Sequence, residues 1–128
     1  MIEWIDKDLT LAYHTLQIAE HGGIHGVRDM GLLESALARP LNLHAYGSDP
    51  DIAALAAAYA FGIVKNHPFL DGNKRTGYVV MEAFIYLNGF ELRAEGTDKY
   101  LTIISLAEGS LSEEELTAWL RERIAPAA

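Results

Sequence analysis

Residues 48–66 have the sequence SDPDIAALAAAYAFGIVKN, which predicts a helix at the centre of a helical bundle. Asp49 is a favourable N-cap, and Pro50 suits the first position of a helix. Alanines fill most positions outside the main apolar stripe, so the helix is apolar on nearly every face and belongs in the interior. The stripe itself consists of Ile52, Leu55, Tyr59 and Ile63.

A second central helix is predicted in TGYVVMEAFIYLNG, residues 76–89, which is also apolar on most faces. The other helices are marked by capping residues and by glycine or proline stops. One is expected from Asp6 to Gly22, a second from Asp29 to Pro40 and a third from Thr97 to Gly109. The last begins with the capping box of Ser112 and Glu115. Residues 40–49 are expected to form an irregular loop.

Strand signals are weak. Apolar and polar residues alternate weakly in GFELRAE (89–95), and MIEWI (1–5) could pair with another segment. We therefore expect at most one small β-hairpin. The sequence contains no internal repeat, linker or low-complexity segment. We therefore expect an all-α single domain spanning residues 1–128, a bundle of about six helices.

The composition excludes several classes of protein. Half of the residues are hydrophobic, as in a folded domain, and the absence of cysteine rules out disulfides and cysteine-based zinc or nucleophile chemistry. The formal net charge of −8 disfavours direct nucleic-acid binding. No apolar run reaches the length of a membrane span, and the N-terminus does not resemble a signal peptide. We expect a soluble, cytoplasmic protein without membrane contact.

The polar nonapeptide HPFLDGNKR, residues 67–75, joins the two central helices and holds the candidate site. A helix starting near Gly72 presents free N–H groups and the positive end of its dipole, which together favour an anion. Gly72 lets a ligand approach the backbone closely, and Asn73 can donate an amide hydrogen bond. Lys74 and Arg75 add positive charge, and an arginine can grip a phosphate with two donors.

Two further residues of the nonapeptide supply the remaining chemistry. Asp71 carries a carboxylate that suits Mg²⁺, which takes few protein carboxylates and shares phosphate oxygens. His67 is the one side chain of the nonapeptide that takes up a proton near neutral pH. The set fits a phosphoryl or nucleotidyl transfer site, although the spacing of a Walker loop is absent.

Each of these residues also has an ordinary structural interpretation. Asp71 can be an N-cap, His67 a loop histidine, and Lys74 and Arg75 a solvated first turn. Phe69 is expected in the core. The combination favours a functional site, because a helix start between two core helices gains nothing structural from so many polar groups.

HPFLDGNKR resembles the signature of the Fic/Doc family, His-x-Phe-x-Asp/Glu-Gly/Ala-Asn-x-Arg, and GVRDMGLLESALARP (26–40) is similar to a segment of its Doc-type members. The resemblance implies an all-α fold with the motif between two central helices. It also implies roles for the residues of the motif: His67 as the general base acting on a protein hydroxyl, Asp71 as the Mg²⁺ ligand, Gly72, Asn73 and Lys74 as the anion cradle, and Arg75 as the phosphate clamp.

Two positions distinguish the branches of this family. Most Fic adenylyltransferases have glycine at the position of Lys74 and a second arginine at that of Tyr78, whereas Doc-type proteins share the lysine and lack the arginine. The resemblance therefore implies a toxin kinase that transfers the ATP γ-phosphate to a protein, with elongation factor Tu as the expected target. Gly72 follows the Fic pattern, so adenylylation with ATP remains an alternative, as does a non-catalytic antitoxin-binding module.

The resemblance also implies a partner. Many Fic proteins carry an inhibitory Ser/Thr-x-x-x-Glu-Gly/Asn motif, and SLSEE (110–114) matches it only in part because Glu115 follows. Inhibition is therefore expected in trans, from a Phd-like antitoxin.

The remaining polar residues are assigned ordinary roles. Arg28 and Asp29 are expected to form an N-cap and a local ion pair. LNLHAYGSD (41–49) occupies the place of a target-docking flap. Four histidines lack metal-ligand spacing and are expected at the surface: His14, His21, His25 and His44.

Overall fold

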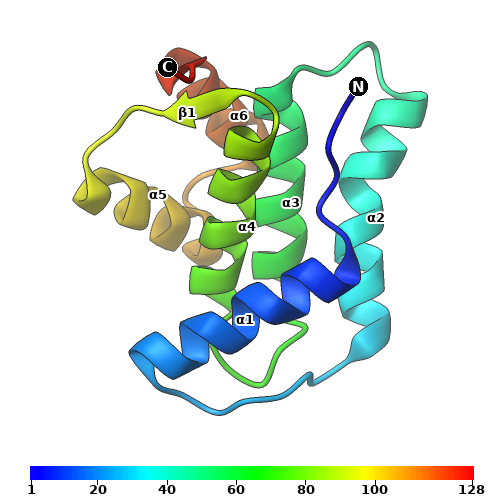
Figure 1. The fold of residues 1–128 in the computed structure, drawn as a ribbon, viewed down its shortest axis with the longest axis vertical. Coiled ribbons are helices and arrows are strands. Elements are labelled where there is room, and N and C mark those ends of the chain that lie inside the picture. Colours follow the sequence, from blue (N-terminus) through cyan, green and yellow to red (C-terminus); the bar gives the residue numbers. More distant parts are fainter.

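The computed structural model describes all residues from Met1 to Ala128 and is predominantly helical, with one small sheet (Figure 1). This confirms the predicted all-α class and the number of helices. The helices are α1 (Lys7–His21), α2 (Met30–Tyr46), α3 (Ile52–Asn66), α4 (Asn73–Leu87), α5 (Gly96–Glu108) and α6 (Glu113–Arg123), and the strands are β1 (Phe90–Leu92) and β2 (Ile124–Pro126). None of the six helices has the length and apolar composition needed to cross a membrane.

Helix α3 lies at the centre of the bundle, as its apolar sequence predicts. It packs against α2, α4 and α6, while α1 crosses α4 near the end of the bundle that holds the loop 67–72 (Figure 1). Small residues allow the helices to approach closely. A Cβ on Gly62 would lie 3.0 Å from the carbonyl oxygen of Ala36 in α2, and one on Gly77 in α4 would lie 2.8 Å from Val64 Cγ2. The loop between α3 and α4 is therefore held by tightly packed helices at both of its ends.

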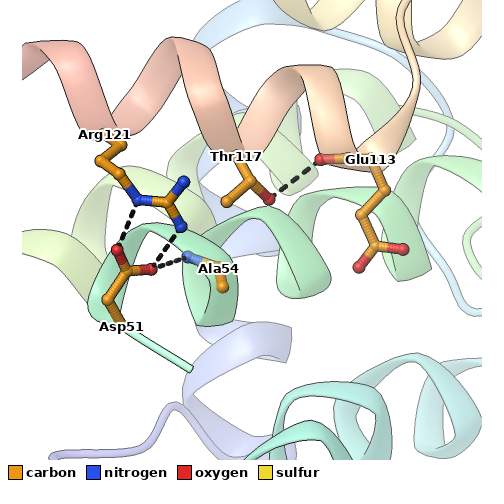
Figure 2. A network of polar contacts seen from close by, with 5 residues as sticks. All are labelled: Asp51, Ala54, Glu113, Thr117 and Arg121. Carbon is orange, nitrogen blue, oxygen red and sulfur yellow. Dashed lines mark hydrogen bonds and ion pairs between the residues drawn. The ribbon is translucent and has the colours of Figure 1, made fainter. Parts of the chain in front are cut away.

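The start of α3 differs from the prediction. Asp51 is the N-cap, not Asp49, and its side chain accepts a hydrogen bond from Ala54 N. Arg121 of α6 pairs with the same carboxylate at 2.7 Å (Figure 2). Asp49 instead takes a left-handed conformation with φ 53° in the preceding connection. The ion pair with Arg121 favours Asp51 over Asp49 as the N-cap. Because Arg121 is distant in sequence, the local sequence pattern cannot reveal this ion pair.

The predicted stop at Pro40 is wrong. Helix α2 continues to Tyr46, and Pro40 lies buried inside it, so residues 41–46 are helical rather than an irregular loop. An internal proline removes a backbone donor and crowds the preceding turn. Here the second half of the helix packs Leu43 against the core, and this burial offsets the cost of the proline.

The chain has one small two-stranded sheet, and its second strand lies at the C-terminus. β1 pairs antiparallel with the C-terminal strand β2, with Phe90 opposite Pro126, so the two strands do not form a hairpin. Ile124 belongs to this strand and not to the last helix. Residues 1–5 form no strand, because the hydroxyl of buried Tyr59 binds both the N–H and the carbonyl oxygen of Ile5.

Candidate active site

The loop 67–72 leaves the C-terminal end of α3 and enters the N-terminal end of α4 (Figure 1). His67 is the C-cap of α3 with φ 52° and ψ 54°, a left-handed conformation that is uncommon for a residue with a Cβ atom. Gly72 is the N-cap of α4 with φ 76°, and no side chain caps this helix. The first N–H groups of α4 therefore lack side-chain acceptors, which leaves a site for an anion.

The side chain of Asn73 serves the loop itself. Its Oδ1 accepts a hydrogen bond from Phe69 N at 2.9 Å, and its Nδ2 donates one to Phe69 O at 3.0 Å. Asn73 is 4 % exposed and Phe69 is fully buried, as expected for Phe69. Because its amide group is occupied within the loop, Asn73 can contact a ligand through its backbone N–H rather than through the side-chain donor predicted from sequence.

The segment 22–29 lies along this loop. Arg28 N donates to Pro68 O at 2.7 Å, and Leu70 N donates to Gly26 O at 3.1 Å, on either side of a single antiparallel bridge between Val27 and Phe69. The connection between α1 and α2 thus covers one edge of the motif. This backbone pairing fixes the path of the loop between its two helices.

Arg28 holds the end of α3. Its Nε donates to His67 O at 2.8 Å and its Nη2 donates to Asn66 O at 3.0 Å. The expected ion pair with Asp29 is absent, although Asp29 is the predicted N-cap of α2. The last carbonyl groups of a helix carry partial negative charge, so a guanidinium beside them is favourable. Arg28 therefore stabilises the backbone that carries His67.

Asp71 does not cap α4. Its Oδ1 accepts from Gly72 N at 2.9 Å and its Oδ2 accepts from Ile24 N at 3.1 Å. The close approach depends on Gly23, where a Cβ would lie 2.7 Å from Oδ2. Each carboxylate oxygen retains a lone pair, although no group of three acidic or histidine side chains is gathered for a metal. A single carboxylate fits Mg²⁺ that takes its other ligands from phosphate and water.

His14 was missed from the sequence. It was expected at the surface, but it is 2 % exposed and its ring stacks on that of Phe69, with centroids 3.8 Å apart and planes 6° apart. Its Nε2 bonds to Asp71 O at 2.9 Å. Leu11 and Ile18, three residues before and four after it, are partly buried, and this apolar spacing was the available signal.

Burial has an electrostatic consequence for His14. Burial lowers its pKa, and the charge of nearby His25 acts in the same direction, while the hydrogen bond to the Asp71 backbone and the charge of Asp71 partly oppose it. The neutral imidazole is therefore the favoured form beneath the loop. The other three histidines are exposed, as expected.

All six residues predicted for the site line a single pocket of about 210 Å³, together with residues from α1 and α5. Arg75 lies with its Cζ 5.3 Å from the ring centroid of Tyr100, and its Nη1 is 3.5 Å from His21 Nε2. Neither Lys74 nor Arg75 belongs to any of the ion pairs of the chain. Unpaired cations are unfavourable at a helix N-terminus, so this arrangement suits a bound anion better than a solvated turn.

The predicted docking flap is not at this site. Residues 41–46 belong to α2, and the connection from α2 to α3 lies at the end of the bundle opposite the loop 67–72 (Figure 1). Helix α3 separates the two regions along its whole length. The segment that does lie beside the motif is 22–29.

Comparison with known proteins places these observations in a family. The model of the Fic/DOC family matches residues 4–85, which include the whole motif. The chain is 37% identical over 97 residues to Toxin Doc of Mycolicibacterium smegmatis (strain ATCC 700084 / mc(2)155), covering 74% of this chain and 72% of that protein. It is 28% identical over 117 residues to Protein kinase doc of Escherichia phage P1, covering 91% of this chain and 92% of that protein.

Proposed function

The chain belongs to the Fic/DOC family, and from this membership we propose that it is the toxin of a toxin–antitoxin pair and acts as a protein kinase. It transfers the γ-phosphate of ATP to a hydroxyl group of a protein, with elongation factor Tu as the expected target, and so inhibits translation. The observation that carries the proposal is the gathering of His67, Asp71 and the phosphate-binding residues around the uncapped start of α4.

The proposed roles follow from the position of each group. His67 accepts the proton of the target hydroxyl, whose oxygen then forms a bond to the γ-phosphorus. The bond between that phosphorus and the β–γ bridging oxygen breaks, and ADP leaves. The backbone N–H groups at the start of α4, with the side chains of Lys74 and Arg75, hold the phosphates. Asp71 would hold Mg²⁺, which supplies neutralising charge to the phosphates when bound.

The surroundings of Tyr78 support γ-phosphate transfer over adenylylation. This residue stands where a second arginine would grip an outstretched phosphate tail, and its hydroxyl lies 3.5 Å from Glu82 Oε1. Burial and the nearby Glu82 raise the pKa of Tyr78, so its phenol stays protonated. A tyrosine cannot supply the positive charge that an arginine would bring to this position. Lys74 instead places a cation next to the loop, where charge develops during γ-phosphate transfer.

Control of the proposed toxin is assigned to a Phd-like antitoxin. The partial inhibitory motif within the chain is occupied, because Ser112 and Glu115 form the reciprocal capping box of α6. A segment that opens a helix in this way is not free to cover the active site. Inhibition is therefore expected from a separate protein, and expression of the toxin alone should arrest growth.

The proposal is tested with elongation factor Tu and ATP labelled at either the α- or the γ-phosphate. Label from γ-labelled ATP should appear on the target, whereas label from α-labelled ATP should not. Transfer of the α-label would identify an adenylyltransferase instead. Absence of both labels, with no rise in melting temperature on adding ATP and Mg²⁺, would favour a non-catalytic antitoxin-binding module.

A further inference from the structure

His14 touches the motif at Asp71, the residue to which the metal is assigned. It lies on α1 and is 2% exposed, and its Nε2 is 2.9 Å from the carbonyl oxygen of Asp71. Asp71 lines the motif pocket, whereas His14 does not. His14 can therefore affect a ligand in that pocket only through the motif residues that it contacts.

The partner of His14 determines which of its ring nitrogens carries the proton. A carbonyl oxygen only accepts hydrogen bonds, so Nε2 must be the donor. The neutral ring then carries its proton on Nε2 and not on Nδ1. The ring of Phe69, stacked 6° from parallel with centroids 3.8 Å apart, holds the plane of the imidazole. Both the tautomer of His14 and the direction of its N–H bond are therefore specified by its contacts.

The peptide group between Asp71 and Gly72 is held at both of its polar atoms. Its carbonyl oxygen accepts from His14 Nε2, and its N–H, which belongs to Gly72, donates to Asp71 Oδ1 at 2.9 Å. A planar trans peptide points its carbonyl and N–H groups in opposite directions. The N–H can therefore face the carboxylate only while the carbonyl group faces His14.

Glycine at position 72 allows this peptide group to rotate. Turning a peptide group over changes ψ of the residue before it and φ of the residue after it, and glycine accepts either sign of φ. Gly72 has φ 76° and is followed directly by α4. In the turned-over peptide the carbonyl oxygen of Asp71 would face its own carboxylate, and the two would repel each other. The hydrogen bond from His14 opposes this rotation.

The second oxygen of the carboxylate is held by the connection between α1 and α2. Ile24 N donates to Asp71 Oδ2 at 3.1 Å, and a Cβ on Gly23 would lie 2.7 Å from the same oxygen. Each oxygen thus accepts one backbone N–H and has electron pairs left for a cation. Ile24 supports Oδ2 directly, whereas His14 supports Oδ1 through the orientation of the peptide.

We propose that His14 is a positioning residue for the metal site: it holds the Asp71–Gly72 peptide and so aims the Asp71 carboxylate at Mg²⁺. The proposal rests on the function proposed above, which assigns Mg²⁺ to Asp71. Groups that orient a metal ligand typically contribute about tenfold to 100-fold to metal affinity. Because the N–H of Gly72 is bonded to Asp71, the phosphates depend on the following N–H groups of α4 and its cations. Loss of the His14 donor should therefore weaken the binding of Mg²⁺ but not that of ATP alone.

The test compares the binding of ATP and of ATP with Mg²⁺ to the full chain by calorimetry. With the affinity of free ATP for Mg²⁺ in the same buffer, these constants give the affinity of the protein–ATP complex for Mg²⁺. His14→Phe keeps an aromatic ring against Phe69 and removes the donor. Thr10→Val is the matched control, because it removes another buried donor of α1, whose acceptor is the carbonyl oxygen of Asp6.

His14→Phe should lower the affinity of the protein–ATP complex for Mg²⁺ by about tenfold to 100-fold. The dissociation constant of ATP alone should not change, and Thr10→Val should leave both constants unchanged. A general loss of structure would weaken both ligands in parallel, so the selective loss of Mg²⁺ distinguishes positioning from folding. Wild-type affinity for Mg²⁺ in folded His14→Phe would overturn the inference, and so would a parallel loss of both ligands or an equal loss in Thr10→Val.

A measurement on the wild-type protein tests the inference even if His14→Phe does not fold. In protein labelled with ¹⁵N at histidine, the chemical shifts of the ring nitrogens show which of them carries the proton. At alkaline pH, where the ring is neutral, His14 should carry its proton on Nε2. A proton on Nδ1 would leave Nε2 unable to donate to Asp71 and would overturn the inference.

Asp71→Ala separates the inference from the function on which it rests. In this variant the affinity of the protein–ATP complex for Mg²⁺ should fall toward that of free ATP. If Asp71→Ala has this effect and folded His14→Phe does not, the metal assignment stands and only the inference fails. If wild-type protein binds no ATP, or if Asp71→Ala retains the wild-type affinity for Mg²⁺, the proposed function or its metal site fails and the inference falls with it.

Discussion

The two ends of α3 share a backbone feature but use their polar side chains differently. Each end is flanked by a non-glycine residue in the left-handed region, Asp49 with φ 53° and His67 with φ 52°, and these are the two such residues in the chain. At the N-terminal end, Asp51 pairs with Arg121, and Thr117 donates to the carbonyl oxygen of Glu113 nearby (Figure 2). Arg39 pairs with Glu113 farther along α3, beside Phe61.

The C-terminal end has polar groups without such partners. Lys74 and Arg75 lie outside every ion pair, and the start of α4 has no side-chain cap. An unusual backbone angle therefore does not by itself mark a functional site, since both ends have one. The distinguishing feature is a concentration of polar groups that the fold positions but does not neutralise. Four substitutions test this distinction, from the largest expected effect to the smallest.

His67→Ala should abolish most transfer of γ-label to the target while leaving the fold intact. Loss of a general base typically lowers the rate by ~10² to 10⁴. ATP binding should persist, because the proposed function assigns the phosphates to the start of α4 and its cations. The measurement is the initial rate of label transfer beside the dissociation constant for ATP.

His67→Asn is the control for backbone conformation, because asparagine tolerates the left-handed region better than alanine. It should be as inactive as His67→Ala. Turnover close to wild type in either variant would show that His67 serves only as the C-cap of α3.

Arg28→Ala should lower the rate less, by about tenfold to 100-fold, the range expected when a reacting group is displaced by a fraction of an ångström to 1 Å. Arg28 reaches the ligand pocket only through the carbonyl groups of His67 and Asn66, so it is a positioning residue. The turnover number should fall with little change in the Michaelis constant for ATP. Arg28→Lys should recover part of the rate. Lysine keeps the positive charge, but its single ammonium group cannot reproduce the two hydrogen bonds that the planar guanidinium makes to the carbonyl oxygens of His67 and Asn66. An unchanged turnover number in Arg28→Ala would remove the positioning role.

The sequence predicts those features of the fold that depend on neighbouring residues. The caps at Asp6, Asp29 and Ser112 are correct, because an N-cap side chain accepts a hydrogen bond from a backbone N–H within one turn of it. The cap at Asp51 was missed because its second partner, Arg121, lies on another helix. The continuation of α2 through Pro40 likewise depends on burial that only the packed bundle provides.

At the candidate site, too, features that depend on neighbouring residues could be predicted and features that depend on distant residues could not. The motif residues adjoin one another in sequence, so their gathering into one pocket could be predicted. The two residues that hold the motif in place, His14 and Arg28, could not be predicted from sequence. They contact the motif from α1 and from the connection between α1 and α2, which are distant from it in sequence.

His14→Gln should change how stability depends on pH. The pKa of His14 in the folded chain lies below the ordinary value of 6.5, so the unfolded chain binds more protons as the pH falls through that value. The stabilising contribution of neutral His14 is therefore present above pH 6.5 and is lost as the pH falls toward the folded pKa. The variant should be less stable at neutral pH by about 2 kcal/mol, a typical cost of disrupting a buried polar interaction, and should lose less stability on acidification.

The measurement is the free energy of unfolding by urea at several pH values. His44→Gln is the matched control, since His44 is exposed near the opposite end of the bundle and should keep the wild-type dependence on pH. The same slope below pH 6.5 in wild type and His14→Gln would contradict the assignment of this proton to His14.

Asp51→Ala should have the smallest effect and no influence on transfer. It removes the cap bond to Ala54 and the ion pair with Arg121, and loss of an N-cap costs about 1 kcal/mol of unfolding free energy. Asp51→Asn can keep the cap bond through its amide oxygen but loses the charge and the acceptor of the Arg121 Nε hydrogen bond, so it should cost less than about 1 kcal/mol, as exposed ion pairs do. The hydrogen bond from Arg121 is the main cause that lowers the pKa of Asp51. Its contribution is therefore present above the ordinary value of 3.8, and it is lost only as the pH falls through the lower folded value. At neutral pH, added salt should reduce the difference between Asp51→Asn and wild type, because salt screens the pair.

Both variants should transfer label at the wild-type rate, since the polar groups at this end of α3 stabilise the fold alone. A loss of rate as large as that of Arg28→Ala would mean that the two ends of the helix are coupled, and the contrast between them would no longer hold.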